Sequence, residues 1–212
     1  MANHQMTQAD RLSLHAAARD LHTQFRGIFG EETIESLLLD SYAELASRAT
    51  VTKFLAVGAE RFARQRLQAL AHAQADAGGR LPAVLFLCVH NAGRSQMALG
   101  WFSQLAEGQA VAWSGGSQPV SVIDPGVLDA MAEVGIDISH EFSKPFTEEF
   151  VLAADVVITM GCGDSCPLLP GKHYEDWELE DPAGKSIDEI RPIRDEIRDR
   201  VANLIEKLTS NP

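Results

Sequence analysis

The sequence is poor in cysteine, in basic residues and in long apolar runs, and each shortage excludes a class of protein. The longest uninterrupted apolar run, residues 83–89, has seven residues. A membrane-spanning helix needs about 20 such residues. The N-terminal residues also lack the apolar stretch that a secretory signal requires. The sequence therefore predicts a protein that does not insert into a membrane, and we expect it in the cytoplasm.

Basic residues are outnumbered by acidic ones, and the imbalance is confined to one part of the chain. The 212 residues include 18 Lys and Arg against 30 Asp and Glu, which gives a net charge of −12. Residues 1–80 hold nine of each sign, so residues 81–212 account for the whole excess. Binding to a nucleic-acid backbone needs a basic surface, so nucleic acid is not an expected partner. An anion bound by the acidic part must be held by a local arrangement of donors.

The three cysteines, Cys88, Cys162 and Cys166, all lie in the acidic part of the chain. An odd number of cysteines without a secretory signal argues against a framework of structural disulfides. In a reducing compartment such residues are buried core residues, metal ligands or redox-active groups. A metal site is disfavoured because no paired histidines or further cysteines complete four ligands. The sequence predicts no cofactor.

Residues 1–79 are predicted to form a domain of three helices. Gly30 is expected to end the first helix, Glu31 and Glu32 to begin the second, and Thr50 to cap the third. The linker to the next domain is the pair Gly78-Gly79. The first helix is identified by apolar residues that recur at helical spacing, namely Leu14, Ala18, Leu21, Phe25 and Ile28.

Residues 80–212 are predicted to alternate between strands and helices. This pattern is typical of an open parallel sheet with helices on both faces, so the expected fold is an α/β catalytic domain preceded by the small all-α domain. Ligands of such sheets bind outside the carboxyl ends of the strands. The expected strands are residues 84–87, 110–113, 156–159 and a short fourth near 173–177, and the expected helices are residues 95–105, 125–134 and a last one after Ser186.

Cys88 stands at the end of the first predicted strand, where the chain turns into a helix. The loop Cys88-Val89-His90-Asn91-Ala92-Gly93-Arg94-Ser95 would direct backbone N–H groups and a helix N-terminus at an anion. Gly93 supplies backbone freedom, and Arg94 supplies a planar fork of donors that suits an oxyanion. The same environment favours the thiolate, so Cys88 is predicted to be a nucleophile that accepts a hydrogen bond from Ser95. The imidazole of His90 is expected to point outward.

These residues carry a resemblance to a known family. Residues 88–97 are similar to the phosphate loop of low-molecular-weight tyrosine phosphatases, and specifically to that of the arsenate reductases built on the same fold. The resemblance continues through residues 114–116, residues 159–162, Cys166-Pro167 and residues 177–184, so it covers roughly residues 81–212. The helical segment resembles an N-terminal addition of some actinobacterial arsenate reductases.

The resemblance implies a thiol-coupled arsenate reductase that also binds phosphate or sulfate as analogues of arsenate. Cys88 would attack arsenate held by the loop and Arg94, with Asp181 as general acid. Cys162 would then attack Cys88 and release arsenite, and Cys166 would form a Cys162–Cys166 disulfide that thioredoxin reduces. From sequence alone, Asp181-Pro182-Ala-Gly is also an ordinary turn sequence. The chain departs from the family in one respect: the three residues between Cys162 and Cys166 are fewer than we expect in the best-known thioredoxin-coupled members.

Two other functions stay open from sequence alone. A low-molecular-weight phosphatase would share the loop and Asp181, but it would need no thiol pair and would carry aromatic residues beside its pocket. A non-enzymatic arsenite or redox sensor would use the helical domain for regulation or DNA binding, although residues 1–80 have no net charge and no cysteine. The apolar faces of the same domain lead us to expect a homodimer.

Overall fold

The computed structural model describes residues 6–49, 54–76, 78–161 and 170–210. The chain divides into two compact units, Met1–Ala75 and Asp76–Pro212. The division lies four residues before the predicted boundary between residues 79 and 80.

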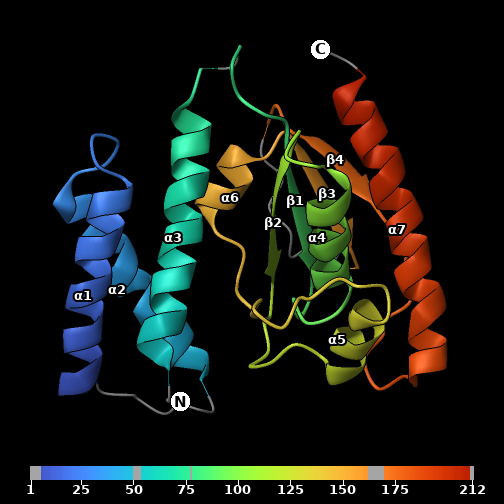
Figure 1. Cartoon of the computed structure of the whole chain (residues 1–212), viewed down its shortest axis with the longest axis horizontal. Coiled ribbons are helices and arrows are strands. Elements are labelled where there is room, and N and C mark those ends of the chain that lie inside the picture. The colour runs from blue at the N-terminus through green and yellow to red at the C-terminus, as the bar shows by residue number, and fades with distance from the viewer. Residues whose placement is uncertain (1–5, 50–53, 77, 162–169, 211–212) are drawn as a thin grey trace. The chain divides into compact units, whose positions relative to one another are not determined.

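Three helices build the first unit, as predicted: α1 (Gln8–Gln24), α2 (Glu31–Arg48) and α3 (Leu55–Gln74) (Figure 1). A capping box begins α1, in which the Thr7 side chain accepts the N–H of Asp10 and the Asp10 carboxylate accepts the N–H of Thr7. The core of the unit is a single apolar cluster that draws on all three helices through residues such as Leu21, Leu38 and Leu67. Apolar packing between amphipathic helices therefore holds this unit together.

The first helix is shorter than the sequence predicts. It ends at Gln24, and Gly27 then takes a left-handed backbone with φ 81°. Ile28, which was expected to continue the apolar stripe, consequently lies outside the helix and is 55% exposed. Gly30 serves as the residue before α2 and does not end α1, so that expectation was wrong. Thr50, the expected cap of the third helix, lies outside the described residues.

The second unit contains a parallel sheet with strand order β2-β1-β3-β4 (Figure 1). Every residue of the central strand β1 is buried, which is the reason its sequence is continuously apolar. Cys88 ends this strand and is paired with Gly116 and Met160 on the neighbouring strands. The carboxyl ends therefore meet at one edge of the sheet. The strands are β1 (Ala83–Cys88), β2 (Val111–Gly116), β3 (Val156–Met160) and β4 (His173–Asp176).

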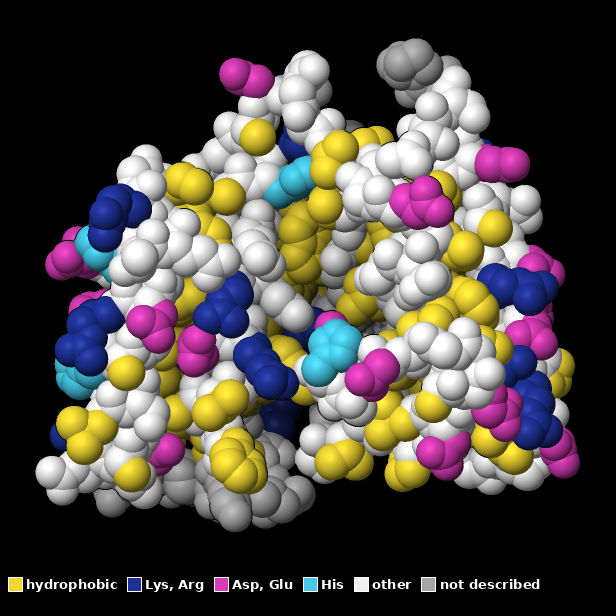
Figure 2. All heavy atoms as spheres, viewed as in Figure 1, with side chains coloured by type: hydrophobic (Ala, Val, Ile, Leu, Met, Phe, Trp, Pro, Cys, Tyr) yellow, Lys and Arg dark blue, Asp and Glu magenta, His cyan; other side chains and the backbone are white. Residues whose placement is uncertain are grey.

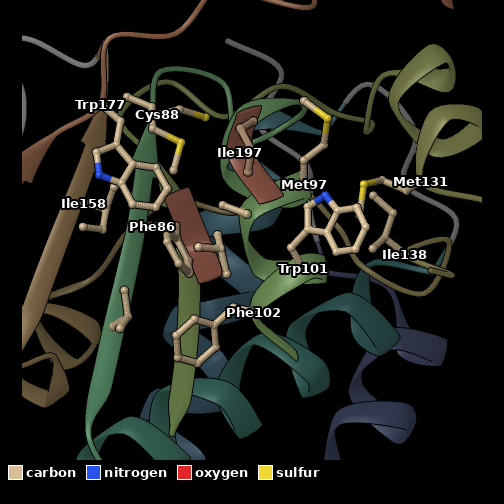
Figure 3. Packing of buried hydrophobic residues seen from close by; sticks show 14 of the residues in the cluster. Phe86, Cys88, Met97, Trp101, Phe102, Met131, Ile138, Ile158, Trp177 and Ile197 are labelled. Atoms are coloured by element: carbon tan, nitrogen blue, oxygen red, sulfur yellow. The ribbon is translucent and has the colours of Figure 1, made fainter. Parts of the chain in front are cut away.

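Helices cover both faces of the sheet, which confirms the predicted α/β fold. One face packs against α4 (Arg94–Leu105), α5 (Pro125–Ala132) and α7 (Ile187–Thr209). In the core of this face the Phe86 ring lies 5.7 Å from the ring of Phe102 and 6.0 Å from that of Trp177 (Figure 3). On the other face Trp113 stacks on Phe150 of α6 (Glu148–Ala153), a helix that sequence analysis missed.

The surface agrees with the composition. On the face shown in Figure 2, both units carry Lys and Arg side chains interspersed with Asp and Glu side chains. Among the described residues, no helix combines the length and the apolar character that crossing a membrane requires.

Tyr42 makes the stability of the first unit depend on pH. Its hydroxyl donates to Asp10 Oδ2 at 3.0 Å, and burial together with this carboxylate raises the pKa of Tyr42 from 10.0 to about 12. The folded state thus favours the neutral phenol. Its contribution to stability is complete below the unfolded pKa of 10.0 and is lost as the pH rises toward about 12.

We expect Tyr42→Phe to lower the free energy of unfolding by about 1 kcal/mol at neutral pH, because a buried hydrogen bond is lost. The difference in the free energy of unfolding between the wild-type protein and Tyr42→Phe should narrow as the pH rises from 10.0 to about 12. Urea denaturation followed by circular dichroism measures both effects. A gap that stays constant across this window would contradict the assignment.

Candidate active site

Cys88 lies at the bottom of the loop that joins β1 to α4. Its side chain is 2% exposed, and its Sγ is 3.0 Å from Ser95 Oγ and accepts the N–H of Asn91 at 3.2 Å. The helix α4 begins at Arg94, so the sulfur sits at a helix N-terminus, where the unpaired N–H groups and the helix dipole favour a negative charge. The surroundings of Cys88 therefore suit a thiolate nucleophile.

Asn91 connects the loop to its surroundings, a role that sequence analysis did not assign to it. It is fully buried and takes a left-handed backbone with φ 48°, a conformation that asparagine tolerates better than most residues. Its Nδ2 donates to Ser95 Oγ at 2.9 Å. Ser95 Oγ is the acceptor in that bond, so its own proton is free for Cys88 Sγ. Asn91 thus orients Ser95 as a donor to the thiolate.

The segment after β2 holds the loop from its outer side. Ser117 N–H donates to Cys88 O at 3.2 Å, and Gln118 N–H donates to Val89 O at 2.8 Å. Gly116 is needed at the start of this contact, because a Cβ there would lie 2.7 Å from Val89 O. The loop carbonyls are thereby occupied on the outside, which leaves N–H groups for an anion on the inside.

Arg94 and Asp181 meet across a small pocket above Cys88. Arg94 Nη2 donates to Asp181 Oδ2 at 3.0 Å, and its Nη1 donates to Leu179 O at 3.3 Å. The pocket has a volume of about 30 Å³. Asp181 also accepts the N–H of Ala183 at 3.2 Å, so the turn interpretation of this sequence holds as well. The described residues that line the pocket are Cys88, His90, Ala92, Gly93, Arg94, Asp124, Asp181, Pro182 and Ala183.

Two glycines allow distant segments to approach Arg94 and the loop. A Cβ on Gly93 would lie 2.5 Å from Pro182 Cγ, so glycine is required here for space. A Cβ on Gly161, which precedes Cys162 in the sequence, would lie 2.9 Å from Arg94 Nη1. Gly161 also takes a left-handed backbone with φ 75°. The ends of β1 and β3 and the Asp181 turn therefore converge on Arg94.

The remaining expected residues are placed as follows. His90 is exposed, in agreement with an outward imidazole, and its carbonyl accepts the Ser143 hydroxyl at 2.8 Å. Cys162 and Cys166 lie outside the described residues.

Asp124, which lines the pocket and caps α5, was not singled out from sequence, although its place before Pro125 at a helix start was a signal. Within the described parts of the chain, no three His, Cys, Asp or Glu residues gather in a way that could hold a metal ion.

Known protein families match both units of the chain. Residues 83–212 match the family described as low molecular weight phosphotyrosine protein phosphatase. Residues 14–71 match the family described as protein-tyrosine-phosphatase-like, N-terminal domain. A glutaredoxin arsenate reductase from Synechocystis sp. is 40% identical over 129 residues, which are 59% of this chain and 98% of that protein.

Solved structures extend the similarity to most of the chain. The thioredoxin-dependent arsenate reductase of Corynebacterium glutamicum is 42% identical, with a TM-score of 0.82 over 94% of this chain and 97% of that one. A structure described as an arsenate reductase in the phosphate binding state is 38% identical, with a TM-score of 0.53 over 60% of this chain and 99% of that one. Relatives therefore occur with and without a counterpart of the first unit.

Gly93→Ala should weaken anion binding, because the new Cβ would collide with Pro182 and push the Asp181 turn away from the loop. The rate at which iodoacetamide alkylates Cys88, followed by mass spectrometry of its peptide, measures binding because phosphate in the loop should slow it. An overpacking cost of about 1–3 kcal/mol would raise the phosphate concentration for half-protection by roughly fivefold or more.

Gly79→Ala is the matched control, since a Cβ there meets nothing within 4 Å. Equal phosphate protection in Gly93→Ala and in the unmodified protein would show that the Pro182 contact does not position the site.

Proposed function

This chain belongs to the low molecular weight phosphotyrosine protein phosphatase family, and we propose that it is an arsenate reductase with Cys88 as nucleophile and thioredoxin as reductant. The observation that carries the proposal is the position of Cys88, at a helix N-terminus beneath the Arg94–Asp181 pair, in a chain whose relatives include arsenate reductases. The proposed role is arsenic detoxification in the cytoplasm.

The pocket suits a bare oxyanion better than a phosphotyrosine. None of its described lining residues is Phe, Tyr or Trp, whereas a phosphatase that acts on tyrosine would need aromatic surface beside the phosphate. The loop N–H groups and Arg94 supply donors on several sides of a tetrahedral anion. The low-molecular-weight phosphatase alternative is therefore not favoured.

Binding of arsenate would begin with a change of partner for Arg94. In the ligand-free site Arg94 pairs with Asp181, whose side chain is 48% exposed and can exchange protons with water. An oxyanion on the loop would take over the Arg94 donors and release the Asp181 carboxyl toward an arsenate oxygen. A protonated Asp181 then serves as the general acid.

The chemical steps balance with three thiols and one external dithiol. The Cys88 thiolate forms a sulfur–arsenic bond while one arsenate oxygen leaves as water with the proton from Asp181. Cys162 attacks Cys88 Sγ, the sulfur–arsenic bond breaks, and its electron pair stays on arsenic, which leaves as arsenite. Cys166 then attacks Cys162, which frees Cys88, and the thioredoxin dithiol reduces the Cys162–Cys166 disulfide. The contact between Gly161 and Arg94 supports this order, since Cys162 follows Gly161 directly.

Thioredoxin is proposed as the reductant because the thioredoxin-dependent relative is aligned with more of this chain than the glutaredoxin-dependent one. The Synechocystis relative is a glutaredoxin arsenate reductase, and 59% of this chain is aligned with it. The thioredoxin-dependent relative of C. glutamicum is aligned with 94% of the chain. Arsenate turnover assayed separately with thioredoxin and with glutaredoxin and glutathione, beside hydrolysis of a phosphate ester, tests both the reaction and the reductant. Ester hydrolysis without arsenate reduction would reject the proposal.

Replacing each cysteine should separate its role in the relay. Cys88→Ser should abolish turnover because no nucleophile is left at the anion loop. Cys162→Ser and Cys166→Ser should release at most a single arsenite per enzyme molecule, because the disulfide that thioredoxin reduces cannot form. Arsenite released per enzyme is counted by chromatography, with the unmodified protein as control. Multiple turnovers by Cys166→Ser with thioredoxin as sole reductant would rule out the relay.

We also propose that the first unit joins two copies of the chain. Each of its helices exposes a large apolar side chain, with Leu12 67%, Leu39 49% and Val57 46% exposed. Such side chains favour an interface between helices. Relatives without a counterpart of this unit suggest that the chemistry does not require it.

A shortened chain that begins at Asp76 keeps Arg80 and its ion pair with Asp155, so it should fold and reduce arsenate. Sedimentation should find the full chain as a dimer and the shortened chain as a monomer. Leu39→Glu, an exposed change that leaves the core intact, should also weaken the dimer. If the full chain sediments as a monomer, the dimer proposal is rejected. If the shortened chain folds but does not reduce arsenate, the first unit contributes directly to the reaction.

A further inference from the structure

Lys144 is the most deeply buried charged side chain in the described parts of the protein, and the reaction proposed above does not use it. The residue is 1% exposed. Its Nζ donates to Glu141 Oε2 at 3.3 Å and to Phe142 O at 3.4 Å, and it lies 4.6 Å from the centre of the Phe142 ring. Burying an ammonium group is costly unless its surroundings compensate for the lost water. Burial lowers the pKa of Lys144, and the Glu141 carboxylate opposes that shift.

The main chain around Lys144 is bonded directly to the anion loop. Lys144 N–H donates to Asn91 Oδ1 at 3.0 Å, and Lys144 O accepts the N–H of Gly116 at 3.0 Å. The Ser143 hydroxyl donates to His90 O at 2.8 Å. Residues 141–144 thus form a segment that touches both the loop and the end of β2. Any force that fixes this segment also fixes Asn91.

Two buried side-chain oxygens on the neighbouring elements α4 and β2 lack a hydrogen-bond partner among the described residues. Gln96 Nε2 donates to Asn91 Oδ1 at 3.0 Å and to Phe142 O at 3.2 Å, yet Gln96 Oε1 is buried without a hydrogen-bond partner among the described residues. Ser114 Oγ is likewise buried without a partner in the described parts of the chain. Ser114 lies two residues before Gly116 and on the same face of β2. A buried acceptor without a donor, such as Gln96 Oε1, is stabilised by a positive charge near it.

We propose that Lys144 is a positioning residue whose ammonium acts as a cation built into the fold behind the anion loop. It holds the 141–144 segment in place, and the segment holds Asn91 Oδ1 through the Lys144 N–H. Asn91 in turn fixes Ser95 and its own N–H against Cys88 Sγ. The positive charge also stabilises the oxyanion that binds on the other side of the loop. Only the effect on turnover rests on the proposed function, because anion binding belongs to the loop itself.

Lys144→Met tests the inference, since it keeps an apolar stem of similar length and removes the charge. The readout is the phosphate concentration that half-protects Cys88 from iodoacetamide, which does not depend on arsenate reduction. We expect that concentration to rise about tenfold, as charge-assisted contacts are lost. The KM for arsenate should rise by a similar factor with a smaller change in kcat. Lys172→Met is the matched control, because Lys172 Nζ donates to Leu152 O and Ala154 O at 2.7 Å, away from the loop.

Two further variants separate the charge from the packing of the side chain. Lys144→Gln keeps a hydrogen-bond donor without the charge and should bind phosphate as weakly as Lys144→Met. Methylammonium should restore part of the phosphate affinity of Lys144→Ala and should leave the unmodified protein unchanged. Wild-type phosphate protection in Lys144→Met or in Lys144→Gln would overturn the proposal, as would failure of methylammonium to restore binding. Unfolding of all three variants would also overturn it, because Lys144 would then support the whole unit and not the loop. If the wild-type protein does not reduce arsenate but these variants bind phosphate more weakly, the proposed function is rejected and the role of Lys144 stands.

Discussion

The buried side chain of Asn91 is the contact on which the rest of the site depends. Its amide group donates to Ser95 and accepts from Lys144 and Gln96, while its backbone N–H reaches Cys88 Sγ. These bonds impose a left-handed backbone on a residue that carries a side chain, which costs about 1–3 kcal/mol. The loop keeps this shape because so many partners surround Asn91. The site is therefore formed before a ligand arrives, which lowers the ordering cost of binding an anion.

The parallel sheet explains how residues from distant parts of the sequence reach this loop. The strands β1, β2 and β3 end at the same edge, which brings Cys88, Gly116 and Gly161 into one neighbourhood. Glycine at the ends of β2 and β3 is a spatial requirement, since a Cβ on either residue would collide with Val89 or Arg94. The same edge could support ester hydrolysis or reduction. What distinguishes the two reactions is the supply of thiols directly after Gly161.

The elements with strong local patterns could be predicted from the sequence, whereas those that depend on distant contacts could not. The apolar run of β1 and the loop that follows Cys88 were visible because strand, loop and helix are adjacent in the chain. The helix α6 has six residues, too few to repeat a helical period. Gly93 is approached closely by Pro182, which is far away in sequence, so no local pattern could reveal that contact. The burial of Lys144 could not be predicted for the same reason. A charged residue in an irregular segment predicts a solvated surface, and only the fold buries it.

In an acidic protein that binds an anion, the short-range attraction at the site must outweigh the long-range repulsion from the net negative charge. The net charge of −12 lies almost wholly outside the loop, and at physiological salt charges more than about 8 Å away are largely screened. The loop donors, Arg94 and the Lys144 ammonium act at shorter range in a region with little water, where each interaction is stronger. Asp181 stays compatible with this arrangement because Arg94 neutralises it in the ligand-free state. An anion that takes the Arg94 donors frees the Asp181 carboxyl from this ion pair. The Arg94 guanidinium thus balances one negative group at a time, first the Asp181 carboxylate and then the bound anion.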